Sequence, residues 1–280
     1  MKHILIIIFL VFSINSCSNF GYKIGYNNLN GLLLDRIDSY FDLKTTQKRI
    51  IQNKLQLLHK WHRKQELPQY RNILSKLQSR IQRGLIKNDY IWLFKNIRRG
   101  WIRIMNKTYK DSIWILSDLQ NDQIEYCAKK FQKNLKELKE ELDSGKIKRK
   151  VKRYNSFIKI MEYFYDDLSD YQKNIIKTKT ASMIDFVPFR YRFYKKRYAQ
   201  FLNILKERNN HITIKNTLNK WMLKTPYSYP YYYRSAMKKM RTQSMAIYLA
   251  IDKSASPDQR LHAKKKLLSL IALIKDLEKG

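Results

Sequence analysis

Residues that make tight turns are scarce in this sequence. Its 280 residues include 7 Gly and 5 Pro, too few for a β-sandwich or β-barrel built of many short strands. Short motifs that mark several enzyme classes are absent as well: there is no Gly-rich phosphate loop, no G-x-S-x-G and no C-x-x-C. The sequence therefore favours an all-α protein, and it gives no support for an enzyme or a cofactor.

Acidic residues are few relative to basic ones. The sequence has 23 Asp and Glu against 57 Lys and Arg, a formal net charge of +34 at pH 7. Apolar residues make up 44%, so the chain can bury a sizeable core. A charge this large attracts polyanions and repels itself in the folded state. Ile, Asn and Tyr are also abundant and share A/T-rich codons with Lys, so genome composition is an alternative source of the excess.

The first residues have the pattern of an export signal. Met1–His3 is a short positively charged start, and Ile4–Phe12 is an unbroken apolar run of nine residues. A helix needs about 20 apolar residues to span a bilayer, so this run is too short for a stable anchor. Its length and position fit a secretory signal peptide over residues 1–16.

Residues 14–17 read Ile-Asn-Ser-Cys, with an aliphatic residue at −3 and a small one at −1 relative to Cys17. This pattern resembles the lipobox of bacterial lipoproteins, in which the cysteine is acylated, for example with palmitate, and the chain is cut before it. Several acyl chains hold a protein at a membrane where one would not. The alternative is an ordinary signal peptide that leaves Cys17 as a thiol. Ser18 in place of Asp favours, by resemblance to known sorting rules, the outer membrane.

Cleavage before Cys17 removes one basic residue, Lys2, and leaves a mature net charge of +33. With Cys17 acylated, Cys127 is the only free thiol and no intramolecular disulfide can form. Cys127 lies in a helical pattern, where we expect a small buried apolar residue rather than a reactive nucleophile.

Apolar residues recur at spacings of three and four through the rest of the chain, which predicts amphipathic helices. Pro68 should kink or restart the helix that contains it, and Gly84 should end that helix. The expected helices cover residues 29–40, 50–61, 73–81, 91–105, 124–142, 151–164, 191–205, 237–251 and 261–277.

Three parts are expected along the chain: the signal peptide 1–16, an acylated cysteine with a short tether over 17–26, and an all-helical domain over 27–280. We expect an elongated bundle of about eight to ten helices. A break near 143–150, where Asp-Ser-Gly precedes a basic run, either divides this domain into two halves or turns a long helical hairpin.

A short motif that ends in Gln recurs four times before a predicted helix, at residues 43–47, 119–123, 168–172 and 255–259. The last two have the capping-box form, with Ser at the N-cap and Gln three residues later. The first two lack Ser or Thr at the cap and are weaker. The spacing between copies is irregular, which argues against a solenoid and favours helix starts within one bundle.

Several segments resemble one family. They are Tyr-Asn-Asn at 26–28, the Asp-rich stretch 35–42 and Trp-His-Arg…Glu-Leu-Pro at 61–68. Together with the Gln-ended helix starts, they resemble Gram-negative lipoproteins grouped as domain of unknown function six-two-seven-nine. The match is sharpest over residues 17–80. It implies a lipid anchor and a helical fold, and it brings no activity. The residues that carry it, of unknown role, are Tyr26, Asn27, Asn28, Asp35, Asp38, Trp61, His62, Arg63, Glu66 and Pro68.

Two clusters of potential ligands occur in this part of the chain. His59, His62 and Glu66 fall at i, i+3 and i+7 and could share a helix face, and imidazole and carboxylate suit zinc. The spacing is not HExxH, so we expect no metal and favour a structural role, with Trp61 on the core and Glu66 neutralising Arg63 or His62. Asp35 and Asp38 are similarly expected to balance nearby cations, while Asp42 precedes the next helix start.

Rings and cations alternate in two segments, residues 189–198 and 227–234. Such segments can stack on nucleic-acid bases or lie at a bilayer interface. The interpretation we favour places the rings in the core and the Lys and Arg heads in water.

These patterns favour a lipid-anchored, non-enzymatic envelope protein, located at the outer membrane and facing the periplasm. Its cationic surface would contact an anionic layer of phospholipid or lipopolysaccharide. The alternative is an adaptor that receives an envelope protein in grooves between helices. Nucleic acid is not an expected partner.

Overall fold

The computed structural model describes residues 19–225 and 227–280, so the signal peptide and Cys17 lie outside the described residues. The prediction of an all-α fold is confirmed. The described residues form twelve α-helices and two π-helices. This is more than the eight to ten expected, because the apolar spacing did not predict the short helices α2, α9 and α11. They are α2 (Asn19–Asn27), α3 (Leu29–Phe41), α4 (Thr45–Trp61), η1 (His62–Glu66), α5 (Leu67–Ile81), α6 (Lys87–Ser117), α7 (Asn121–Asp143), α8 (Lys146–Tyr165), α9 (Asp170–Ala181), α10 (Val187–Lys206), α11 (His211–Leu218), η2 (Asn219–Leu223), α12 (Tyr231–Ser254) and α13 (Pro257–Lys279).

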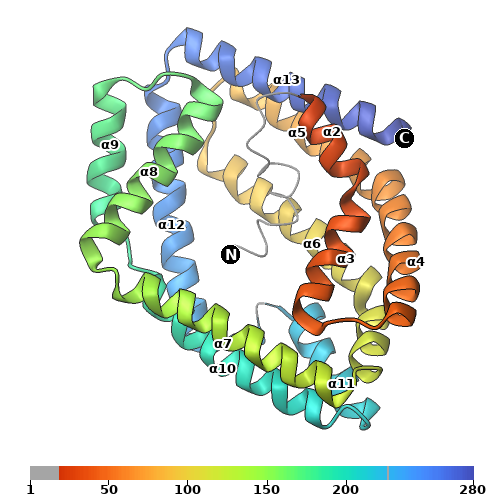
Figure 1. The fold of residues 1–280 in the computed structure, drawn as a ribbon. Helices are drawn as coiled ribbons and strands as arrows, with labels where there is room; N and C mark the ends of the chain where they lie inside the picture. Colours follow the sequence, from red (N-terminus) through yellow and green to blue (C-terminus); the bar gives the residue numbers. More distant parts are fainter. Residues whose placement is uncertain (1–18, 226) are drawn as a thin grey trace.

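The helices follow one another around a ring, and α6 runs across the middle of the view (Figure 1). Two pairs that are distant in sequence pack side by side, α5 with α13 and α7 with α10. None of the helices among the described residues combines the length and apolarity needed to cross a bilayer.

The residues expected to form a tether are instead helical from Asn19 onward. Helix α2 packs against α13, and Lys23 forms an ion pair of 2.8 Å with Asp276. Tyr26 is only 2% exposed and belongs to a core cluster with Leu67 and Leu277. The aromatic spacing of Tyr22 and Tyr26 gives α2 an apolar face, so this segment is part of the folded body.

The core is divided into two large clusters and the small one around Tyr26. One large cluster joins α4 and α7 to α10 and α11, with Leu205 and Ile214 fully buried in it. The other joins the end of α5 to α8, α9, α12 and α13, with Ile247 and Ile251 at its centre. Each cluster contains residues from before and after the 143–150 segment, so the turn there, at Gly145 with φ 85°, does not separate two independent cores.

The four recurring Gln residues meet in two reciprocal pairs. Gln47 and Gln123 exchange amide hydrogen bonds of 3.2 and 2.8 Å, and Gln172 and Gln259 exchange bonds of 2.8 and 2.9 Å. In every copy, Oε1 also accepts the N–H of the residue at that helix's own N-cap. Each pair therefore fastens two helix starts together, one pair beside each large core cluster.

The two pairs differ in their caps, as the sequence indicates. Ser169 and Ser256 accept the N–H of Gln172 and Gln259, which completes the predicted capping boxes. Lys44 and Gln120 make no side-chain cap bond, so only the Gln half of the box is present in the first pair.

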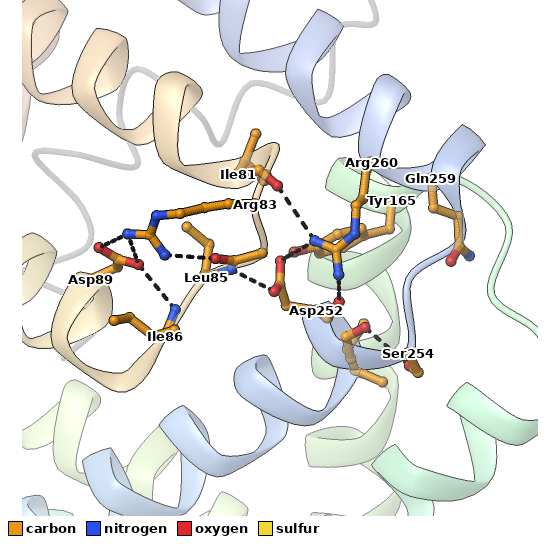
Figure 2. A network of polar contacts seen from close by, with 12 residues as sticks. Ile81, Arg83, Leu85, Ile86, Asp89, Tyr165, Asp252, Ser254, Gln259 and Arg260 are labelled. Carbon is orange, nitrogen blue, oxygen red and sulfur yellow. Dashed lines mark hydrogen bonds and ion pairs between the residues drawn. The ribbon is translucent and has the colours of Figure 1, made fainter.

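A buried carboxylate ties three regions of the second cluster together (Figure 2). Asp252, 1% exposed, accepts hydrogen bonds from Tyr165 Oη and from the N–H of Leu85, both at 2.7 Å. Arg260 neutralises it and also donates to the carbonyl oxygens of Ile81 and Asp252. Both oxygens of this carboxylate accept hydrogen bonds from protein groups, which favours a structural role.

Candidate functional site

The residues of the family pattern converge on a π-helical turn. A helix runs from Thr45 to Ile81 with one π-helical turn, η1, in its middle, and the N–H of Leu67 donates to the carbonyl of His62 five residues back. Pro68 follows immediately, and it has no N–H to donate to the preceding turn. The prediction that Pro68 kinks or restarts the helix is confirmed as a restart, since α5 begins at Leu67 with Pro68 in its first turn.

Tyr26 from α2 meets the π-turn at His62. Its hydroxyl lies 2.9 Å from His62 Nδ1, and both side chains are buried. The Tyr26 ring makes an edge contact with His59 at 4.7 Å, and His62 makes one with Tyr70 at 5.6 Å. The result is a packed group of two imidazoles and two phenols.

Glu66 is paired with Arg103 of α6. The guanidinium donates two bonds, of 2.6 and 2.8 Å, to the two carboxylate oxygens, and Glu66 is 1% exposed. The sequence-based expectation that Glu66 neutralises Arg63 or His62 is wrong. Its partner is the planar guanidinium of Arg103 on α6, which is 37 residues further along the chain. Gly100 permits this approach: a Cβ there would lie 3.2 Å from Tyr70 Cε1.

Arg63 turns outward, toward α2. It donates to Asn27 Oδ1 at 2.9 Å and lies 5.3 Å from the centre of the Tyr26 ring. Trp61 is half-buried, with the Lys107 ammonium 5.8 Å from its ring centre.

The remaining family-pattern residues make local contacts. Asn28 bonds the carbonyl of Ile24. Asp35 is exposed, while Asp38 pairs with Lys48 and accepts the N–H of Leu43, which confirms the predicted charge balance for Asp38. Asp42 ends α3 in a left-handed conformation, φ 49°, before the helix start it was expected to precede.

Burial controls the protonation of this cluster. It lowers the pKa of His62 to about 4, and the nearby charge of His59 lowers it further by a smaller amount. Burial also lowers the pKa of His59. Burial also raises the pKa of Tyr26. Within residues 19–225 and 227–280, no three His, Cys, Asp or Glu side chains are arranged to hold a metal ion. At neutral pH the cluster is neutral apart from the Glu66–Arg103 pair, which suits a structural role.

A different site lies between α10, η2 and the loop before α12. It is a pocket of about 110 Å³ lined by Phe193, Lys196, Arg197, Gln200, Lys220, Trp221, Ser228 and Pro230. Three of these residues are cationic and none is acidic.

Arg197 lines the pocket beside two aromatic rings. Its guanidinium carbon is 4.1 Å from the Trp221 ring centre and 5.1 Å from that of Phe193. Burial lowers the pKa of Arg197 from its usual range. Among the described residues, no carboxylate forms an ion pair with Lys196, Arg197 or Lys220.

In the segments 189–198 and 227–234, most side chains lie as expected, with rings in the core and Lys and Arg heads in water. Phe193 and Tyr233 are buried and stack at 4.1 Å, while Lys195 and Lys196 are exposed. Arg197 departs from that interpretation because its guanidinium lies against the rings of Trp221 and Phe193. Trp221 had no signal in the sequence: it is one ring in a short helical stretch, and only the fold places it beside α10.

A family model described as "Family of unknown function (DUF6279)" matches residues 39–234. The chain belongs to this family. The DUF6279 span includes the π-turn, Arg103 and every residue that lines the pocket. It begins after five of the family-pattern residues: Tyr26, Asn27, Asn28, Asp35 and Asp38. The resemblance seen over residues 17–80 is therefore confirmed at the level of the family, with the matched region extending much further along the chain. No curated protein and no solved structure matches the chain.

Proposed function

We propose that this DUF6279 protein is a lipid-anchored envelope lipoprotein whose cationic surface binds an anionic layer, of phospholipid headgroups or lipopolysaccharide phosphates. It would be held through Cys17, at the outer membrane and facing the periplasm. It would act by binding and not by catalysis.

The observation that carries this proposal is the excess of basic side chains that form no ion pair among the described residues. All Lys and Arg except Lys2 lie in the described residues, 56 of the 57, and all 23 acidic residues lie there too. Ion pairs in the described residues involve twelve of these 56 cations. Each remaining Lys or Arg near an anionic surface contributes about 1 kcal/mol of attraction.

Two exposed rings support contact at the level of headgroups. Tyr227 and Tyr231 are 72% and 78% exposed and flank the loop that precedes α12. Arg98 lies 5.9 Å from the centre of the Tyr227 ring. Tyr is favoured at membrane–water interfaces, where its ring and hydroxyl meet apolar and polar layers together.

Vesicle bridging tests the surface separately from the anchor. The acylated protein is inserted into neutral vesicles, and labelled vesicles of phosphatidylglycerol or of phosphatidylcholine are then added. We expect capture of the anionic vesicles at low salt, and loss of most of it at about 0.5 M salt, where the Debye length is only a few ångströms. Equal capture of the two vesicle types, or capture insensitive to salt, would overturn the surface proposal.

The anchor has its own test. Cells expressing the protein are labelled with radioactive palmitate, with and without globomycin, beside a Cys17→Ser variant. Label on the wild type alone and accumulation of precursor with globomycin are the expected results. An unmodified mature terminus in mass spectrometry contradicts the anchor. Salt-insensitive, stoichiometric capture of one envelope protein would favour the adaptor alternative.

A further inference from the structure

The pocket between α10 and η2 presents more hydrogen-bond donors than the fold uses. The guanidinium of Arg197 carries five N–H donors, and in the described residues it makes one long bond, 3.4 Å, to the carbonyl oxygen of Ser228. The Phe193 and Trp221 rings lie close to this guanidinium and do not accept its hydrogens in a normal hydrogen bond. A positioned donor set without an acceptor is suited to a planar or tetrahedral oxyanion.

The charges around the fork point the same way. Lys196 is one residue before Arg197 on α10, and Lys220 precedes Trp221 in η2, so three cations border one small cavity. Their mutual repulsion is not offset by a lining carboxylate. Such an arrangement has a free-energy cost that a bound anion would remove.

The loop and the start of α12 complete the wall. Pro230 is the N-cap of the 24-residue helix α12, whose first turn contains no acidic residue and no side-chain cap. The N-terminal end of a helix favours negative charge. The hydroxyl of Ser228 is buried and has no hydrogen-bond partner among the described residues.

From these contacts we infer that the pocket binds a phosphate monoester group, with Arg197 as the central ligand and Lys196 and Lys220 as flanking charges. This inference deepens the proposed function, and it rests on that proposal only for the expectation that the ligand belongs to the envelope. A cavity of about 110 Å³ has room for a phosphate group, and the rest of the ligand would extend out of the pocket into solvent.

A monoester fits better than a diester because of charge. A phosphate monoester carries about −1.5 to −2 at pH 7, since its second pKa is near 6, whereas a diester carries −1. Three cations are best balanced by the dianion. The same chemistry is found on a lipid headgroup such as phosphatidic acid and on a small soluble phosphate, and the experiment has to separate these two sources.

Calorimetric titration of the full acylated protein in neutral detergent, at about 0.3 M salt, tests the pocket while screening the surface. The probes are inorganic phosphate, glycerol 3-phosphate and the diester glycerophosphoglycerol. We expect one saturable site for the two monoester-type probes, at least about tenfold weaker binding of the diester, and a clear loss of affinity between pH 7.5 and pH 5 as the second proton is regained. Absence of saturable binding at millimolar phosphate would overturn the inference.

Charge-matched variants assign the site. Arg197→Met should weaken monoester binding by about tenfold or more, because the loss of a charge-assisted hydrogen bond has that magnitude. Arg49→Met removes the same charge from an exposed residue of α4 and should leave the affinity unchanged. Equal effects of the two variants would show a non-specific field and refute the pocket. Lys220→Met, at an exposed side chain that the fold does not need, covers the case in which the Arg197 variant fails to fold.

The vesicle arm identifies the source. Glycerol 3-phosphate bound to the wild type is challenged with vesicles containing phosphatidic acid or phosphatidylglycerol. Displacement by the first vesicles alone indicates a lipid monoester, and absence of displacement indicates a soluble one. Arg197→Met and Arg49→Met should lower salt-sensitive bridging of anionic vesicles equally. If the wild type binds the monoester but shows no salt-sensitive bridging of anionic vesicles, the surface proposal is overturned and the pocket remains in place.

Discussion

Arg103 and Arg197 are both half-buried arginines, yet their surroundings differ in one respect. Arg103 donates two short bonds to the buried Glu66, whereas Arg197 has no carboxylate partner in the part of the chain that the structure describes. The first arrangement neutralises itself and joins η1 to α6. The second leaves its donors available. In a chain with so many cations, the absence of a partner at a positioned arginine distinguishes a binding group from a structural one.

Removal of the Glu66 carboxylate should have the largest effect on stability. Glu66→Ala empties a site that is 1% exposed and removes the two short bonds from Arg103, whose side chain is 40% exposed, and we expect a cost of about 2–4 kcal/mol. Urea unfolding of the variant and the wild type measures the loss. Glu66→Gln keeps part of the hydrogen bonding and should cost less. If Glu66→Ala costs under about 1 kcal/mol, the pair is not structural and the comparison with Arg197 fails.

Acidification should weaken the same cluster through His62. Its pKa is about 4 in the folded protein and 6.5 when unfolded, so the unfolded state takes up the proton first. Stability from neutral His62 is fully present above pH 6.5 and falls by about 1.4 kcal/mol for each pH unit down to pH 4. Unfolding curves of the wild type and of His62→Gln over this range isolate the effect. Parallel pH profiles for the two proteins would show that His62 does not titrate in this way.

Loss of the Tyr26 hydroxyl should cost less, about 1–3 kcal/mol, because Tyr26→Phe leaves the buried His62 Nδ1 without its hydrogen bond but keeps the ring packing. Tyr231→Phe, at an exposed ring, is the matched control and should be within about 0.5 kcal/mol of the wild type. Thermal and urea unfolding measure both. A neutral Tyr26→Phe variant would mean that α2 is held by packing alone.

Arg197→Met is expected to have the smallest effect on the free energy of unfolding, although it should have the largest effect on monoester binding. Arg197→Met removes no ion pair, and the methionine side chain can occupy the space between Trp221 and Phe193. We expect a change within about 0.5 kcal/mol in urea unfolding. Arg103→Met, by contrast, leaves Glu66 buried without a cation and should cost about as much as Glu66→Ala. Similar losses for the two methionine variants would remove the distinction between the two arginines.

Local features of the fold could be predicted from the sequence. Spacings of three and four residues placed most helices, Pro68 indicated the interruption, and the Gln-ended motifs marked four helix starts. These signals work because helix periodicity, caps and proline act within a few residues along the chain.

Partners that are distant in the sequence could not be predicted. The exchange of amide bonds between Gln47 and Gln123, or between Gln172 and Gln259, joins residues 76 and 87 apart. The pairing of Glu66 with Arg103 and the approach of Trp221 to Arg197 depend likewise on how the helices close into a ring. The pattern of one helix constrains its own buried face, but not which of many cations will lie opposite a given acid.

The position of α2 bears on how freely the protein could move if it is anchored to a membrane. With the anchor proposed here, only two peptide steps separate Cys17 from the first described helical residue, Asn19, a reach of at most about 7 Å. Helix α2 packs against α13 and the π-turn, so an acylated Cys17 would hold the whole folded domain close to the membrane surface. The folded body would then rest against the lipid with its α2 side inward, and its partners would have to come to it.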